Sequence, residues 1–122
     1  MNNLICSVLV LLIFIIAGCG ASETANNEIN TYGLTQEQYD FVKNETIPGG
    51  KLDFKKQFES SRLTLFDNVA YNQKDAALYI WAAAMKRLGV SKAEDAISLY
   101  EELTTTKLRD PEKTAMQNGF KR

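Results

Sequence analysis

Histidine is absent from the 122-residue chain, and cysteine and proline occur only twice each. Without histidine, the sequence lacks the most common general base of enzymes and a frequent metal ligand. An excess of positive charge is also missing, because 14 lysines and arginines stand against 15 aspartates and glutamates. Proteins that bind nucleic acid through its phosphates usually have a clear basic excess. These absences argue against histidine-dependent catalysis and against electrostatic binding of nucleic acid.

Charged side chains are missing from residues 1–22, so all 29 of them lie further along the chain. An apolar run extends from Leu4 to Ile16 and is interrupted only by Ser7. As a helix it would span about 20 Å, less than the ~30 Å hydrocarbon core of a membrane. Its length instead matches the apolar part of a secretory signal peptide. A buried N-terminal helix or an uncleaved anchor is the less favoured alternative.

Small residues follow this run, and Ile16-Ala17-Gly18-Cys19 resembles the lipobox of bacterial lipoproteins. The lipobox is an aliphatic residue, two small residues and a cysteine. The resemblance implies that a diacylglyceryl group is attached to the Cys19 thiol and that signal peptidase II cuts between Gly18 and Cys19. It also implies a membrane-anchored protein on the extracytoplasmic face, because two acyl chains give stable anchoring. Cys6 would leave with the signal peptide, so no free thiol would remain.

These patterns divide the chain into three segments. Residues 1–18 are interpreted as a lipoprotein signal peptide, and residues 19–33 as a lipid-anchored flexible tether. The tether is small and polar without periodicity, so it cannot bury enough surface to offset the entropy of ordering. Residues 34–122 are expected to form one helical domain, in which order begins at Leu34.

The first half of this domain is expected to hold two helices. Thr35 and Gln38 form a capping-box pattern that predicts a helix of about ten residues, which Pro48 and the glycines after it would end. A second helix is expected over about 52–68, because apolar residues recur there at spacings of 4, 7 and 4. The residues of that stripe are Phe54, Phe58, Leu65 and Val69.

A third helix has the strongest local signals. Asn72, with Asp75 three residues later, suits its beginning, and Gly89 suits a left-handed end. The ten residues over 76–85 carry no charge. A helix that is apolar on most sides usually lies at the centre of its domain, so this helix is expected to be the core element.

The last part of the chain predicts two further helices. Ser91 and Glu94 form a second capping-box pattern for a fourth helix of about 15 residues. Asp110 as a cap and Pro111 in the first turn then predict a short terminal helix that ends near Asn118. No segment shows convincing strand alternation. The predicted fold class is therefore all-α, a small bundle of four to five helices.

The sequence argues against a helix-turn-helix DNA-binding motif in this region. The segment from Met85 to Ala93 resembles the turn of helix-turn-helix DNA readers, because a predicted helix ends there in Gly-Val-Ser. Further on, Asp95 and Ser98 stand where that motif needs inward apolar side chains. A glycine-capped pair of helices is the favoured interpretation.

Three other groups of side chains have a plain structural explanation. The carboxylates of the predicted fourth helix point in different directions and suit a solvated face better than a metal site. The basic residues of the predicted second helix form a stripe that could touch anionic lipid headgroups, but acidic residues are interspersed with them, which favours a solvated face. The aromatic residues fit core packing better than a ligand pocket. These groups are Glu94, Asp95, Glu101 and Glu102; Lys51, Lys55 and Arg62; and Tyr79, Trp81 and Tyr100.

The function that these observations favour is that of a membrane-anchored bacterial lipoprotein whose helical domain binds another cell-envelope protein. No enzymatic activity and no cofactor are expected, and the partner-binding residues stay unidentified. One concrete form is an exclusion or immunity factor of a mobile element. The alternative is a cell-wall ligand-binding protein or enzyme accessory. A cytoplasmic helix-turn-helix DNA-binding protein is the least favoured of the three.

Overall fold

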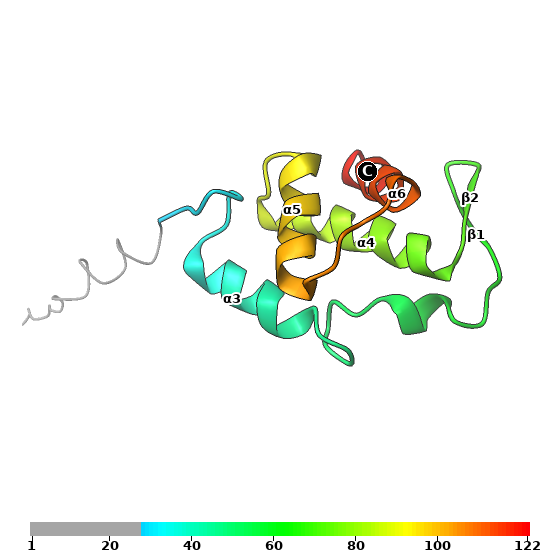
Figure 1. The fold of residues 1–122 in the computed structure, drawn as a ribbon, viewed down its shortest axis with the longest axis horizontal. Coiled ribbons are helices and arrows are strands. Elements are labelled where there is room, and N and C mark those ends of the chain that lie inside the picture. The colour runs from blue at the N-terminus through cyan, green and yellow to red at the C-terminus, as the bar shows by residue number, and fades with distance from the viewer. Residues whose placement is uncertain (1–27) are drawn as a thin grey trace, which may run out of the picture.

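The computed structural model describes residues 28–122, which form four α-helices, a short 3-10 helix and a β-hairpin (Figure 1). The coarse prediction of a mostly helical domain is confirmed, but the hairpin makes the all-α assignment wrong in detail. In chain order the elements are α3 (Gln36–Glu45), η1 (Lys55–Phe58), β1 (Thr64–Phe66), β2 (Val69–Tyr71), α4 (Gln73–Leu88), α5 (Ala93–Thr104) and α6 (Asp110–Phe120).

Helix α4 is the central element, as its apolar sequence predicts. At its beginning, the Asn72 side chain accepts the Asp75 backbone N–H at 2.8 Å. At its end, Gly89 has a φ of 123°, a conformation that favours glycine. The main core forms where α3, α5 and α6 meet α4, and Val42, Leu99 and Met116 are fully buried there. Both predicted ends of this helix are confirmed.

Helix α6 lies against α4 at very short range. Gly119 is buried in this contact, and a Cβ atom added to it would lie 2.0 Å from the carbonyl oxygen of Tyr79. Glycine is therefore required for the two helix backbones to approach so closely. Ala115 and Met116 bury the rest of the same helix face.

The prediction of a second helix over about 52–68 is wrong. Its span holds η1 and then β1, which pairs antiparallel with β2 through Phe66 opposite Val69. The turn between the strands is Asp67-Asn68, with φ values of 50° and 66°. Aspartate and asparagine tolerate this left-handed backbone, so the pair forms a tight two-residue hairpin turn. The apolar stripe is divided as a result, since Phe58 is buried while Leu65 and Val69 are exposed.

Two predicted helix beginnings also differ. Helix α5 begins at Ala93 after Lys92, with no side-chain cap, so the Ser91–Glu94 capping box is absent. Ser91 lies instead near the turn at Gly33. Helix α6 has Arg109 rather than Asp110 as its N-cap, because the Glu112 carboxylate accepts the Arg109 backbone N–H. It also continues to Phe120, two residues beyond the predicted end.

Ordered contacts begin slightly earlier than the predicted Leu34. Ile29 forms an isolated β-bridge with Thr35. The Asn30 side chain accepts the backbone N–H groups of Tyr32 and Leu34. The beginning of α3 is as predicted, because Thr35 and Gln38 form both hydrogen bonds of the capping box. No helix within residues 28–122 is long and apolar enough to cross a membrane.

Candidate functional site

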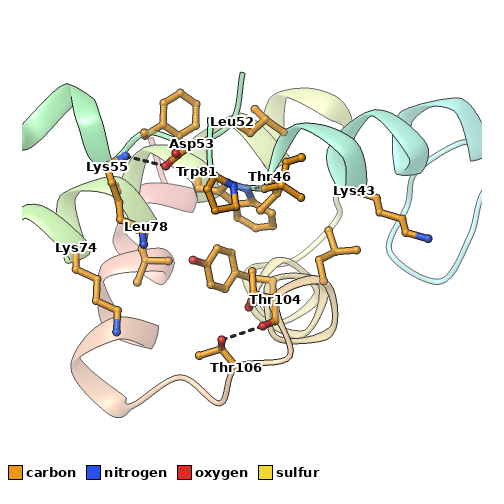
Figure 2. Close-up of a pocket in the computed structure, with 16 residues that line it drawn as sticks. Lys43, Thr46, Leu52, Asp53, Lys55, Lys74, Leu78, Trp81, Thr104 and Thr106 are labelled. Atoms are coloured by element: carbon orange, nitrogen blue, oxygen red, sulfur yellow. Dashed lines mark hydrogen bonds between the residues drawn. The ribbon is translucent and has the colours of Figure 1, made fainter. Parts of the chain in front are cut away.

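A cleft of about 420 Å³ opens between the end of α3, the connection that follows it, α4 and α5 (Figure 2). We call it the lysine-rimmed cleft. Its size is in the range of small-molecule sites, and its floor is apolar. The apolar side chains that line it include Leu52, Phe54, Leu78, Trp81 and Leu103.

Trp81 forms a rigid wall of this cleft. Its side chain is 2% exposed, and its indole N–H donates to the Thr46 hydroxyl at 3.2 Å. That hydroxyl in turn donates to the Val42 carbonyl at 2.6 Å. The Tyr100 ring meets Trp81 edge to face, with centroids 5.0 Å apart. Both aromatic residues therefore belong to the core, as predicted, and also line the cleft.

Lysines surround the opening of the cleft. Figure 2 shows that Lys55 and Lys74 approach from the same side, whereas Lys43 extends away at the other end. The Gln73 side chain donates to the Lys55 carbonyl at 3.0 Å and so fixes η1 to the beginning of α4. The second helix that would carry Lys51, Lys55 and Arg62 on one face is absent, and the fold brings Lys55 to this rim instead.

Few carboxylates balance these ammonium groups. Asp53 is the acidic residue that lines the cleft, and it accepts the backbone N–H groups of Gly49 at 2.8 Å and Lys55 at 3.4 Å. Both ion pairs within residues 28–122 involve Glu112, which holds the Lys74 ammonium at 2.6 Å. Among these described residues, the ammonium groups of Lys43 and Lys55 have no carboxylate within ion-pair distance.

The Tyr100 hydroxyl is a free donor at the same site. It has no hydrogen bond to any residue of 28–122, while the Thr104 and Thr106 hydroxyls donate to backbone carbonyls. Burial raises the pKa of Tyr100, and the negative charges of Asp53 and Glu112 raise it further. The phenol therefore keeps its proton and can donate it to a ligand.

Glu112 is the most deeply buried charged group among residues 28–122, with 1% of its surface exposed. It accepts the Arg109 backbone N–H at 2.7 Å, the Lys74 ammonium at 2.6 Å and the Arg109 guanidinium at 3.0 Å. These contacts, the backbone N–H first, lower the pKa of Glu112 to about 2. Glu112 was not among the predicted site residues. Its position three residues after Arg109, next to Pro111, is typical of the beginning of a helix and could have identified it.

The carboxylates of Glu94 and Glu102 on α5 are exposed, as predicted for a solvated face, while those of Asp95 and Glu101 are half-buried. Glu102 accepts the hydroxyls of Tyr32 and Tyr39, the latter at 2.7 Å, which ties the N-terminal segment and α3 to α5. The hydrogen bond to Glu102 raises the pKa of Tyr32 to about 12. Glu101 accepts the Leu108 backbone N–H at 2.8 Å. In the part of the chain that the structure describes, no three acidic, Cys or His side chains are grouped as metal ligands.

The β-hairpin presents an apolar surface to solvent. Leu65 and Ala70 are cross-strand partners and share one face. Leu63 lies directly before β1 and is also exposed. We call the surface of these three residues the apolar hairpin surface. Leu63 is 64% exposed and Leu65 is 68% exposed.

The opposite face of the hairpin is fixed to the helices. Phe66 stacks on Tyr79 with ring centroids 4.2 Å apart, and the Arg122 guanidinium lies 5.4 Å from the Phe66 ring. The Asn118 amide of α6 donates to the Tyr71 hydroxyl at 3.0 Å. The hairpin is therefore held on a packed aromatic base rather than extended freely into solvent.

The predicted lipidation residue Cys19 and the cleavage position after Gly18 lie outside the described residues. The same is true of the predicted signal peptide and of the tether up to residue 27. Comparison of the chain with protein families, with characterised proteins and with solved structures gave no match.

Proposed function

We propose that this chain is a bacterial lipoprotein, anchored through Cys19 to the extracytoplasmic face of the membrane, whose domain binds another protein of the cell envelope. The anchoring rests on the lipobox resemblance of residues 16–19. The binding role rests on one observation, the apolar hairpin surface. The proposal assigns no enzymatic activity to the domain.

The hairpin has two properties that favour contact with a protein. Large exposed leucines are typical of a recognition surface when they are clustered. In addition, β1 and β2 form a two-stranded sheet, so each strand has an outer edge with no strand partner among residues 28–122. An open edge offers backbone N–H and C=O groups to which an extended segment of a partner can add a strand.

The position of the hairpin also supports this role. The hairpin and the first described residues lie at opposite ends of the longest axis (Figure 1). Eight residues lie between Cys19 and Glu28, and the nine Cα–Cα steps from one to the other reach at most about 30 Å. A chain held at Cys19 would therefore present the hairpin away from the membrane. An exclusion or immunity factor of a mobile element is one concrete form of such a small anchored binder.

Metabolic labelling with a fatty acid tests the anchoring. Cells that express the wild-type chain should yield labelled protein in the membrane fraction, and Cys19→Ala should abolish the label. Cys6→Ala is the matched control and should keep it, because Cys6 is removed with the signal peptide. A label that persists in Cys19→Ala, or an unlabelled wild-type chain, would contradict the proposal.

A second candidate function is supported by the lysine-rimmed cleft. An apolar floor with a few convergent polar groups is typical of a small-molecule site. This observation favours a ligand-binding protein of the cell wall. The two functions use separate surfaces, so one chain can have both.

A further inference from the structure

The charges around the lysine-rimmed cleft favour an anion. The charged side chains that line the cleft are Lys43, Lys55, Lys74 and Asp53, three cations and one anion. Lys43 extends away and Lys74 is paired with Glu112, so Lys55 supplies the ammonium group without an ion-pair partner among residues 28–122 on that side. One such ammonium group suits a monoanion and disfavours a cation.

The polar groups gather at one end of the cleft. Lys55 and Lys74 are on the same side in Figure 2, and the Gln73 hydrogen bond to the Lys55 carbonyl links their backbones. Tyr100 lines the same cleft, and its ring meets Trp81 edge to face. The cleft thus has two lysines on one side and a phenol donor beside the apolar wall of Trp81.

We propose that the lysine-rimmed cleft binds a small organic carboxylate with an apolar body, its acid group toward Lys55 and Lys74 and its apolar part on Trp81. The acid group completes the hydrogen bonding of the Tyr100 hydroxyl and of the Lys55 ammonium. The apolar body covers the floor of Leu78 and Trp81. The inference uses no residue of the hairpin and does not depend on lipidation. It rests on the second candidate function, ligand binding in the cleft, and names the chemical class of the ligand.

Trp81 is a built-in reporter of this binding, because it is the single tryptophan of the chain. The full chain, in phosphatidylcholine vesicles, is titrated with octanoate, 1-octanol and octylammonium while its fluorescence is recorded. Octanoate should change the fluorescence in a saturable manner, with an affinity about tenfold higher than that of octylammonium, since one charged hydrogen bond is worth about that factor. An equal response to the two ions, or no saturable change with octanoate, would overturn the assignment.

Neighbouring lysines supply a matched pair of variants. Lys55→Gln should weaken octanoate binding by about five- to tenfold and leave 1-octanol unaffected. Lys56→Gln is the control, because Lys56 belongs to the same short helix, is exposed and does not line the cleft. Tyr100→Phe should also weaken octanoate binding, by about threefold or more. Lys74 is left intact because it holds the buried Glu112. Equal losses in Lys55→Gln and Lys56→Gln would overturn the proposal.

Discussion

At the scale of single residues, a buried carboxylate and an exposed one organise the domain. Glu112 has three charged or backbone donors around it and lies at the junction of α4 and α6. Glu102 is near the surface, yet two tyrosine hydroxyls converge on it from segments 63 and 70 residues away in sequence. Buried charges are tolerated only when they are paired and hydrogen-bonded, and Glu112 meets that condition.

Glu112 makes the stability of the domain depend on acid pH. Its pKa of about 2 in the folded state is below the ordinary 4.5, so its stabilisation is complete above pH 4.5 and is lost as the pH falls toward 2. Glu112→Gln should lower the free energy of unfolding at pH 7 by about 1–3 kcal/mol. Urea unfolding of both proteins at pH 7 and pH 2.5 measures this, and the difference should shrink at the lower pH.

The matched control for this experiment is Glu94→Gln. Glu94 is an exposed carboxylate in the first turn of α5. Its substitution should change the free energy of unfolding by less than about 1 kcal/mol. Equal effects of the two substitutions at pH 7 would refute the assigned role of Glu112.

Substitution of Tyr32 should change local order rather than the global stability of the domain. Tyr32→Phe removes one hydroxyl from Glu102 and should loosen the segment that precedes α3, while the core stays intact. Hydrogen exchange should speed up at the backbone amides of Tyr32, Gly33 and Leu34 and stay unchanged in α4. Thr31→Ala, at an exposed neighbouring position, should leave these rates unaltered. Unchanged exchange in Tyr32→Phe would mean that Glu102 does not hold the segment.

At the scale of helices and strands, those helix ends that short-range sequence signals determine could be predicted. The ends of α4 and the beginning of α3 follow from caps whose hydrogen bonds lie within a few residues. The hairpin could not be found in this way, because strands of three residues are too short for alternation and its apolar spacing also fits a helix. Its formation depends on aromatic contacts such as Phe66 with Tyr79, 13 residues apart.

The cleft could not be predicted from the sequence for a similar reason. It combines side chains of α3, η1, α4 and α5, and its lysines are spread over 32 residues, from 43 to 74. Trp81, Tyr100 and Lys55 were named from the sequence, but the two aromatic residues were assigned to the core and the lysine to a solvated face. Only the packing of η1 on α4 places them around one cavity.

Because α4 and α6 are in close contact, Gly119→Ala should have two opposing effects on the stability of the domain. By helix propensity alone, Gly119→Ala would stabilise α6 by about 1 kcal/mol. Because the added Cβ would lie 2.0 Å from the Tyr79 carbonyl oxygen, the substitution should instead destabilise the domain by about 3 kcal/mol. Thermal unfolding measures the sign. Gln117→Ala, at an exposed position of the same helix, should change stability by less than about 0.5 kcal/mol, and a stabilising Gly119→Ala would show that the helices are further apart.

At the scale of the whole molecule, the account joins a lipid anchor to a domain with two separate surfaces. The segment from Ile29 to Gly33 lies at one end of the domain and the hairpin at the other (Figure 1). The lysine-rimmed cleft is lined by residues of α3, η1, α4 and α5 and by none of the hairpin. With the proposed anchor at Cys19, this arrangement would leave the apolar hairpin surface at the end of the domain that faces away from the membrane.

Photocrosslinking in intact cells tests this central claim most directly. A photoreactive phenylalanine analogue in place of Leu65 should give one discrete adduct with an envelope protein. The same analogue in place of Thr114, an exposed position on α6, should give none. The adduct should also disappear when Leu65 is probed in a chain that carries Cys19→Ala, because that chain is not anchored. Adducts of equal yield at both positions, or no adduct at Leu65 in the anchored chain, would contradict the account.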